Sequence, residues 1–403
     1  MRYRPVYDED DSEYGGFVSD RDRGGYVDEE YEGGFVSEVG EDYFSEEAAA
    51  SVHEEKLARR QDRKAKKQRR KLRRVLLLLA LLLVCEGIFL FSRWARPPEV
   101  NREITEQTAE DVYRHSAARK NGCYTFLIAG KDRAAGLTDT VLVGMMDTKN
   151  HTMRFVSIPR DTAVNISWSP KKINQYYPAA ENQGRDGVTA LVEGVEKLIG
   201  YRVDCYAVFD VEVFVELVDT MGGVWFDVPI DMNYDDPDQE LWIHVNQGYQ
   251  LLNGTDAMGV FRYRKTYVNG DIGRLDVQHN LLKAIASQML TLGNIPNVRK
   301  LVKIYERDVI TNLSTGNVMF FLKEFLKMSE ENIVFDTIPA NYGGEVHGMS
   351  YVIIYLNQWL DYLNTYLNPF SEPITTSNLD IIYANDNGNL TATTGTIRGN
   401  DRW

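Results

Sequence analysis

The chain has 403 residues, of which 43% are hydrophobic, and its formal net charge is −14. This length and apolar content are sufficient for one large or two ordinary globular domains. The three cysteines form no Cys-x-x-Cys pair and the six histidines are scattered, which argues against a zinc site. Cys123 and Cys205 are expected either to form a disulfide, if their region lies outside the cytoplasm, or to remain buried free thiols.

The first 55 residues are strongly acidic, with 18 Asp and Glu against 4 Lys and Arg. They are rich in Gly and Tyr and poor in aliphatic residues, so they cannot bury a core, and we predict a disordered cytoplasmic arm over 1–55. The segment contains a near repeat, GGFVSD at 15–20 and GGFVSE at 33–38. This repeat is either low-complexity drift or a pair of short linear motifs for a cytoplasmic partner.

A basic segment and an apolar run follow the acidic arm. Residues 56–74 hold 12 Lys and Arg against one Asp, and 75–91 read VLLLLALLLVCEGIFLF. With Ser92 and Trp94 the run approaches the ~20 residues that a spanning helix needs, so we predict a single transmembrane helix over 75–94. A cleaved signal peptide is disfavoured, because 74 residues precede the run and no small-x-small site closes it.

The charge asymmetry around the predicted span sets its orientation. Twelve basic residues precede the span and few follow it, so the N-terminus is predicted to be cytoplasmic and the C-terminal domain extracellular. The basic segment is then better explained by anionic lipid headgroups than by nucleic acid, which we do not expect as a partner. Glu86 within the span indicates either a partner in the membrane or contact with water at the outer interface.

After a linker and helix at 95–120, the pattern becomes that of a globular α/β domain. Strands are predicted at 123–130, 140–147, 153–159, 203–210, 224–229 and 334–339, with a hairpin turn DTKNHT between the second and third. Helices are predicted at 188–200, 211–223, 271–293 and 351–367. The β-α-β order implies a sheet covered by helices on both faces. Residues 369–403, rich in Asn, Thr and Gly, are predicted to form a loose tail.

The first candidate site is GKDRAAGLTDT at 130–140. Asp132 lies just after one predicted strand and Asp139 begins the next, and α/β folds bind ligands at strand ends. Two carboxylates that converge there suit a hard divalent cation, Mg²⁺ or alternatively Mn²⁺. Considered alone, the two acids are more simply explained as turn or cap residues.

The second candidate site is SIPRDT at 157–162, where Arg160 and Asp161 follow a predicted strand. The nearby KKINQYY at 171–177 adds Lys172 and Asn174. An isolated Arg–Asp pair is more often a structural salt bridge than a binding site, so this motif carries weight only together with the others.

The third candidate site is VFRYRKTYVNGDIGRLDVQ at 260–278. If 260–264 is extended, Arg262 and Arg264 share one face, and if it is helical they diverge; the sequence leaves both open. Asp271, Arg274 and Gln278 share one face of the predicted helix at 271–293. A solvated charged helix face is the simpler explanation, but aliphatic residues flank these positions. Guanidinium groups bind phosphate through paired hydrogen bonds and keep their charge, so the arginines favour phosphate chemistry.

The order of these motifs resembles the LytR-CpsA-Psr family. GKDRAAGLTDT, SIPRDT, KIN, LVDTMGGVWFDVP, LNGTDAMGVFRYRK and GDIGRLDVQ occur in the family's order over residues 121–365. The resemblance implies a three-layer α-β-α sandwich with a central mixed sheet at 121–368. It also implies an extracytoplasmic, Mg²⁺-dependent phosphotransferase. Such an enzyme moves an anionic glycopolymer, as in teichoic acid or capsule attachment, from a polyprenyl-pyrophosphate carrier to peptidoglycan, often with pyrophosphatase activity.

The resemblance also assigns roles to individual residues. Asp132 and Asp139 match metal ligands, and Lys172 and Gln278 fall on substrate-binding positions. Asp271 is expected to act as a base or to orient Arg274. The remaining matches are the pyrophosphate-binding, catalytic arginines Arg160, Arg262, Arg264 and Arg274.

One position departs from the family pattern. Leu137 stands where the family commonly has an Arg, and Arg133 is the candidate replacement for that phosphate contact. This departure keeps open a second function, a non-catalytic module that binds polyprenyl phosphate or wall polymer. A groove for the lipid tail is expected on the apolar face of 188–199 or of 211–221, although such helix stripes are usually core.

Overall fold

The computed structural model describes residues 66–67, 69–71, 73, 77, 95–100, 118–131, 138–237, 241–265, 267, 271–291 and 298–399. The chain divides into two units, Met1–Leu82 and Leu83–Trp403. The arm predicted over 1–55 lies outside the described residues, and so does the predicted span at 75–94 apart from Leu77. Among the residues that are described, no helix has both the length and the apolar character needed to cross a membrane.

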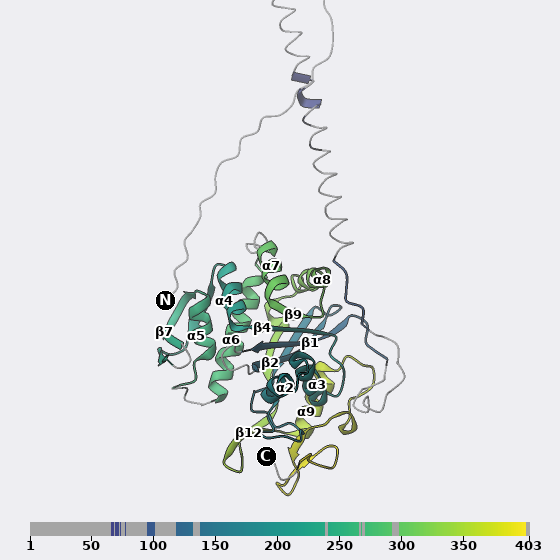
Figure 1. The fold of residues 1–403 in the computed structure, drawn as a ribbon. Helices are drawn as coiled ribbons and strands as arrows, with labels where there is room; N and C mark the ends of the chain where they lie inside the picture. The colour runs from purple at the N-terminus through teal and green to yellow at the C-terminus, as the bar shows by residue number, and fades with distance from the viewer. Residues whose placement is uncertain are drawn as a thin grey trace, which may run out of the picture. The chain divides into compact units, whose positions relative to one another are not determined.

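A six-stranded mixed sheet forms the centre of the second unit (Figure 1). In spatial order its strands are β10 (Ile333–Thr337), β3 (Thr152–Ser157), β2 (Thr138–Asp147), β1 (Cys123–Lys131), β4 (Cys205–Asp210) and β9 (Val309–Thr311). The pairs β1–β4 and β10–β3 are parallel, and the other neighbours are antiparallel. The predicted α/β class with a central mixed sheet is therefore confirmed, as is the hairpin between β2 and β3.

Helices cover both faces of this sheet. Successive side chains along β1 point to opposite faces, so each face presents apolar residues that pack against helices. Leu127 and Ala129 belong to a core with α2 (Tyr176–Glu181), α3 (Gly187–Ile199) and α9 (Leu356–Tyr362). Tyr124 and Phe126 belong to a second core with α8 (Thr315–Phe325) and part of α6 (Asp271–Met289). Cys123 and Cys205 are buried and free, so the second of the two expectations for these thiols holds.

Helix α3 shows how local sequence sets these elements. Asp186 caps its N-terminus by accepting a hydrogen bond from the Thr189 backbone N–H, and Gly200, with φ of 83°, ends it in the left-handed conformation. Its buried residues include Leu191, Val195 and Leu198, at the spacing of one helix face. The helix is therefore fixed by its caps and by its packing on the sheet.

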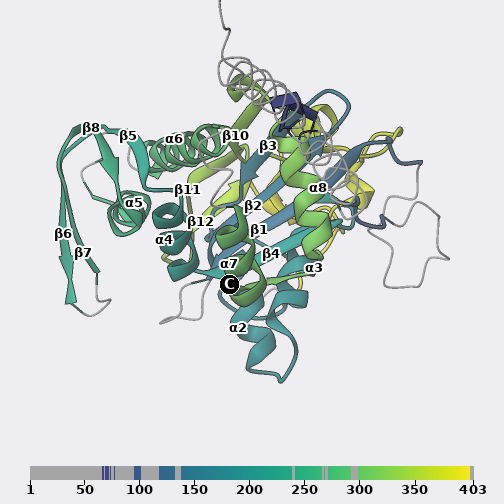
Figure 2. The same ribbon diagram turned by 90° about the horizontal axis from the view of Figure 1, so that it is seen from above.

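A separate group of elements packs to one side of the central sheet (Figure 2). It comprises α4 (Val211–Thr220), β5 (Val224–Val228), β6 (Met232–Asp236), β7 (Leu241–Val245), β8 (Gly248–Leu252), α5 (Gly254–Arg262) and much of α6, around a core of their own. The strand predicted at 224–229 is β5, which pairs with β8 and not with the central sheet; β6 pairs with β7. These elements carry the third motif toward the sheet edge.

Helices α4 and α5 cross at a glycine. A Cβ atom on Gly254 would collide with the backbone carbonyl of Val215. The backbone N–H of Gly254 also donates a 2.6 Å hydrogen bond to Asp219 Oδ1. The adjacent Asn253 caps α5 through the Asp256 N–H. The position of α5, which ends at Arg262, therefore depends on a close helix crossing.

The C-terminal third departs from expectation at two places. The run at 351–367, predicted as one helix, contains β12 (Met349–Ile354), α9 and then a π-helical turn η5 (Leu363–Leu367). β12 pairs with β11 (Ala340–Val346) and β13 (Ile382–Ala384), and Tyr351–Ile354 are all buried. A short apolar run of this kind has no periodicity that separates strand from helix.

The second departure concerns 369–403, which is not a loose tail over its described part. The segment contains η6 (Thr376–Asn378), β13 and β14 (Leu390–Ala392), and Ile381 and Ile382 are fully buried. Asn165 donates to Asp380 at 2.7 Å, and its side-chain oxygen accepts from the Arg398 N–H at 2.8 Å. Scattered isoleucines among polar residues thus anchor the segment. The remaining described elements are η1 (Ile173–Gln175), α7 (Val298–Asp308) and η4 (Glu330–Asn332).

Candidate functional site

A polar cleft of about 610 Å³, including the space open to solvent at its mouth, lies where β2 begins and β3 ends. Because the two strands are antiparallel, with Leu142 opposite Ser157, the start of one and the end of the other meet at the same edge. Its polar lining residues are Asp139, Thr140, Ser157, Arg160, Asp161, Arg264, Arg274, Gln278 and Tyr342. The cleft therefore combines residues of all three sequence motifs.

Asp139 lies at the centre of the charges in this cleft. Its Oδ1 accepts a 2.9 Å hydrogen bond from Arg160 Nη1, and its Oδ2 lies 3.8 Å from Arg264 Nη2. Each of the three side chains keeps between 30% and 45% of its surface exposed. The carboxylate thus holds two guanidinium groups side by side while leaving them accessible.

A second carboxylate, Asp161, connects Lys172 to the cleft. Lys172 Nζ lies 2.8 Å from Asp161 Oδ1 and 5.2 Å from the centre of the Tyr351 ring. Arg160 Nε lies 3.9 Å from the other oxygen of Asp161. Lys172 is therefore adjacent to the cleft through Asp161.

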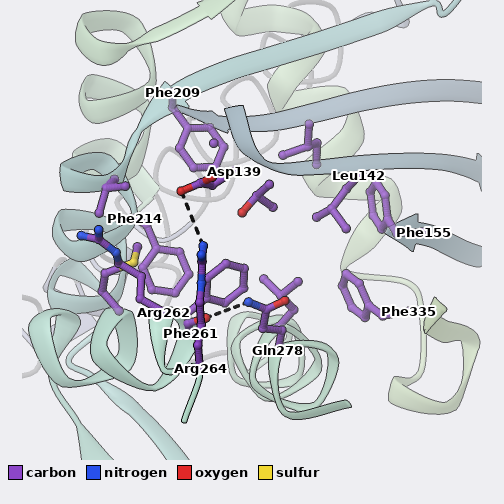
Figure 3. A pocket seen from close by; sticks show the side chains of 16 residues that line it. Asp139, Leu142, Phe155, Phe209, Phe214, Phe261, Arg262, Arg264, Gln278 and Phe335 are labelled. Atoms are coloured by element: carbon purple, nitrogen blue, oxygen red, sulfur yellow. Dashed lines mark hydrogen bonds and ion pairs between the residues drawn. The ribbon is translucent and has the colours of Figure 1, made fainter. Parts of the chain in front are cut away.

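The two arginines of FRYRK differ in direction, which resolves the alternative that the sequence left open. Helix α5 ends at Arg262, and Tyr263 is extended and buried, so Arg262 and Arg264 do not belong to one strand face. In Figure 3, Arg264 points toward Asp139, whereas Arg262 extends away from that carboxylate. Arg264 consequently lines the polar cleft, and Arg262 lines the neighbouring cavity.

Helix α6 supplies the remaining wall of the cleft. Arg274 and Gln278, one helical turn apart, both line it, as their spacing predicts. Gln278 Nε2 donates a 2.7 Å hydrogen bond to the Phe261 carbonyl, which ties α6 to the end of α5 (Figure 3). Asp271 is the first residue of α6, but its side chain lies outside what the structure describes.

The arginines create a strongly positive site. The pKa of Arg264 is lowered by partial burial and by the positive charges of Arg160, Arg274 and Arg262, and Asp139 opposes this shift. Arg keeps its proton at any working pH, so the lowered pKa reflects a cation that has lost hydration on burial and is also repelled by its neighbours. An anion that enters the cleft relieves this repulsion.

A mostly apolar cavity adjoins the polar cleft. Its volume is about 1020 Å³, including the space open to solvent at its mouth. Its apolar lining residues are Ile128, Leu142, Phe155, Phe209, Val211, Phe214, Met258, Phe261, Leu282 and Phe335. Asp139, Thr140, Arg264 and Gln278 line both spaces, so the two share a rim.

Of the two helices expected to form a lipid groove, only the second lines this cavity. Val211 and Phe214 of α4 line the cavity, whereas the apolar residues of α3 are buried in the main core. The phenylalanines of β3, β4, β10 and α5 could not be predicted as lining residues from the sequence, because they come from elements far apart in the chain. Ser157 was also missed as a lining residue, although it opens the SIPRDT motif.

Of the residues proposed from sequence, Asp139, Arg160, Arg264, Arg274 and Gln278 come together in one cleft. Asp132, Arg133 and Leu137 lie outside the described residues. Within the described part of the chain, no group of three or more His, Cys, Asp or Glu side chains is placed to hold a metal ion. The accessible carboxylate of Asp139 still fits Mg²⁺, because that ion commonly takes only one or two protein carboxylates, with phosphate oxygens and waters as the other ligands.

Relatives with known names match this chain. TagV of Bacillus subtilis, a polyisoprenyl-teichoic acid–peptidoglycan teichoic acid transferase, is 33% identical over 183 residues. That match covers 44% of this chain and less than half of the relative, 45%. TagU of Bacillus licheniformis, which has the same transferase name, is 26% identical over 278 residues, or 67% of this chain and 86% of the relative.

Comparison of folds and of family models agrees with these matches. The crystal structure of B. subtilis TagV superposes with a TM-score of 0.50 at 27% identity, over 61% of this chain and 96% of that one. The model of the LytR_cpsA_psr family matches residues 96–367, which include the whole polar cleft. The chain is therefore a member of the LytR-CpsA-Psr family.

Proposed function

We propose that this chain is an extracytoplasmic phosphotransferase that moves an anionic glycopolymer from a polyprenyl-pyrophosphate carrier to peptidoglycan. The observation that carries the proposal is the shared rim between an arginine-lined cleft and an apolar cavity. A polyprenyl pyrophosphate has a charged head joined to an apolar tail, and these two spaces match its two parts. The transferase names of the TagV and TagU relatives support the same reaction.

The pyrophosphate is expected to bind among the guanidinium groups of Arg160, Arg264 and Arg274. Arginine forms paired hydrogen bonds with phosphate oxygens, and its charge stabilises the charge that develops on phosphoryl oxygens during transfer. The tail is expected to enter the cavity between Phe214, Phe261 and Leu282. Arg262 lines that cavity beside the rim, and Lys172 reaches the cleft through Asp161.

Transfer requires a new bond and a broken one. The oxygen of an acceptor hydroxyl bonds to the phosphorus that carries the glycopolymer, and the bond from that phosphorus to the bridging oxygen breaks. Polyprenyl phosphate leaves with the electron pair, beside the arginines. In the pyrophosphatase side reaction, water takes the place of the acceptor hydroxyl.

Asp139 and Asp132, which lies seven positions before it in the sequence, are our proposed ligand pair for Mg²⁺ or Mn²⁺. When bound, the cation supplies additional positive charge for the pyrophosphate oxygens. Asp139 also pairs with Arg160 and Arg264, so the same carboxylate positions the guanidinium groups. Asp271, at the start of α6, is proposed to orient Arg274 or to act as a base.

The proposal places the chain in the cell membrane as a single-pass protein, with its N-terminus in the cytoplasm. The sequence features at 56–74 and 75–94 support this placement. We further propose that the acidic arm at 1–55 contacts cytoplasmic division or wall-synthesis proteins, in agreement with its paired GGFVS motifs.

The decisive experiment measures transfer by the full chain in detergent. The donor is a polyprenyl-pyrophosphate-linked glycan, the acceptor is purified peptidoglycan, and Mg²⁺ is present. Arg264→Ala is expected to lower the rate by about 10² to 10³, as for the loss of one preorganised charge-stabilising donor. Arg185→Ala, at an exposed loop arginine outside the cleft, is the matched control. Binding of the donor without transfer would support the non-catalytic module instead.

A further inference from the structure

A serine that lines the polar cleft lies against a buried histidine. Ser157 Oγ is 2.8 Å from His279 Nε2. Ser157 lines the cleft together with Asp139, Arg160, Arg264 and Arg274, whereas His279 is 9% exposed. The hydroxyl therefore faces the proposed pyrophosphate site, and the imidazole lies behind it.

Both side chains are held firmly in place. Ser157 ends β3, is paired with Leu142 on one side and Thr337 on the other, and its carbonyl accepts the Ile338 N–H at 3.1 Å. The His279 ring stacks on Phe335, with centroids 6.5 Å apart. The neighbouring Gln278 fixes the rotation of α6 through its bond to the Phe261 carbonyl.

The proposed transfer needs a group that takes the proton of the acceptor hydroxyl. Lys and Arg are charged at neutral pH and cannot accept it, and the cations paired with Asp139 and Asp161 disfavour protonation of these carboxylates. Of the two roles proposed for Asp271, the relay leaves to it the orientation of Arg274. A neutral imidazole is a suitable acceptor because its usual pKa lies near the working pH. Among the described residues that line the cleft and the printed hydrogen-bond partners of their side chains, His279 is the only imidazole.

We propose that Ser157 and His279 form a proton relay for this transfer, in which Ser157 touches the acceptor hydroxyl and His279 acts through Ser157. This inference rests on the proposed function. As the acceptor oxygen bonds to the phosphorus, its proton passes to Ser157 Oγ and the Ser157 proton passes to His279 Nε2. The bond to the bridging oxygen breaks, and polyprenyl phosphate leaves. The proton on His279 later returns through Ser157 to water.

The surroundings of His279 agree with this role. Burial lowers the pKa of His279, while Asp276 on the same helix and Asp336 on β10 oppose the shift. Asp336 is itself bound by Arg154 and by the Tyr362 hydroxyl, at 2.6 Å. Because its pKa is lowered, the imidazole of His279 is mainly in its neutral form at pH 7. The relay uses the tautomer with the proton on Nδ1, in which Nε2 accepts from Ser157.

The test is the pH dependence of kcat for the full chain, with a polyprenyl-pyrophosphate disaccharide as donor and peptidoglycan as acceptor. The unmodified chain should lose rate tenfold per pH unit below the pKa of His279. His279→Gln keeps a hydrogen-bonding side chain but does not titrate, so it should lower kcat by about 10²-fold and abolish this acid limb. The Kd of His279→Gln for farnesyl pyrophosphate should differ less than twofold from that of the unmodified chain. His244→Gln, at an exposed histidine of β7, is the matched control.

Ser157→Ala should reproduce the loss in kcat, and Ser157→Thr should restore part of it by keeping the hydroxyl. If Ser157→Ala does not fold, the Thr and His279→Gln variants still decide the question. An unchanged rate and acid limb in His279→Gln would overturn the relay while leaving the proposed function intact. A glycan-phosphate adduct on Ser157 after rapid quenching would overturn it in favour of a covalent nucleophile. Absence of transfer by the unmodified chain would overturn both proposals.

Discussion

Asp139 on β2 accepts a 2.9 Å hydrogen bond from Arg160, which lies just beyond the end of β3, so one carboxylate joins two of the family motifs. The same carboxylate lies 3.8 Å from Arg264, which belongs to a third motif more than a hundred residues away. A pair of partly exposed charges contributes only about 0–1 kcal/mol to stability. The importance of Asp139 is therefore expected in the geometry of the cleft.

Arg160→Lys tests this geometry directly. Lysine keeps the charge but loses the planar fork that binds Asp139 and phosphate together, so transfer should fall by at least tenfold with little change in unfolding temperature. Arg160→Ala should lower it further. Equal activity of Arg160→Lys and the unmodified chain would show that charge alone is sufficient. The measurement is the initial rate of glycan transfer at saturating donor.

Filling the apolar cavity should discriminate between donors by tail length. Leu282→Trp adds volume beside Phe214 and Phe261 and leaves the arginines in place. We expect KM to rise about tenfold or more for a donor with a long polyprenyl tail, since each buried CH₂ is worth about 0.8 kcal/mol. A donor with a two-isoprene tail should be nearly unaffected. Ile310→Trp, at an exposed residue of β9, is the control.

Glu196 on α3 predicts a pH dependence of stability that is separate from catalysis. Burial raises the pKa of Glu196 from 4.5 to about 7, while its bond from the Val203 N–H opposes the shift. The unfolded chain therefore ionises this group more easily, and stability should fall as pH rises from about 4.5 to 7. The full difference is about 3 kcal/mol, from 1.36 kcal/mol per pKa unit.

Glu196→Gln keeps an acceptor for the Val203 N–H and removes the ionisation. Urea unfolding should then show a variant that is more stable than the unmodified chain at pH 8, with the difference disappearing near pH 4.5. The neighbouring exposed Glu193→Gln should change this slope little. A parallel pH dependence in Glu196→Gln would assign the slope to other groups.

Gly254→Ala should disturb the site through the fold. The added methyl collides with the Val215 carbonyl, so α4 and α5 must separate, and both helices line the apolar cavity. We expect a loss of stability of about 1–3 kcal/mol, as for overpacking in a core. Gly343→Ala, where a Cβ would meet only Asn341 Oδ1 at an ordinary 3.6 Å, separates this collision from a general effect of losing glycine.

The buried thiols should be unreactive and unpaired. Burial raises the pKa of Cys123 to about 11, with Asp147 adding to the shift, and burial raises the pKa of Cys205 as well. The thiolate is the reactive form, so a Cys85→Ser chain should resist a thiol reagent at pH 8 when folded. In denaturant it should show two free thiols without reductant. A requirement for reductant would instead reveal a disulfide.

Much of the central sheet follows from the sequence, because its strands are apolar runs bounded by Gly, Pro and Asp. The turn at 148–151 and the capped helix α3 have local signals that tertiary contacts do not override. The smaller sheets are different. β5 and β7 expose Trp225 and Trp242, and their strands are five residues long, so hydrophobicity alone gives little indication of their pairing.

The candidate site likewise has features that could be predicted from the sequence and features that could not. The type of chemistry was readable from motifs, and the spacing of Arg274 and Gln278 was enough to place them on one face. The divergence of Arg262 and Arg264 was not readable, because it depends on where α5 ends, at an extended and buried Tyr263. The Ser157–His279 pair joins residues 122 positions apart, a relation that a single sequence does not contain.

The packing of residues 369–399 has a practical consequence for the limits of the catalytic part. The family match stops at 367, yet Ile381 and Ile382 are fully buried and β13 extends the sheet of β12. A protein cut at the family boundary would lose Ile381, Ile382 and β13. It would expose the apolar residues that they cover and leave the edge of β12 open to pair with another chain. Aggregation of such a fragment would reflect a missing strand, and adding back the last thirty or so residues should restore solubility.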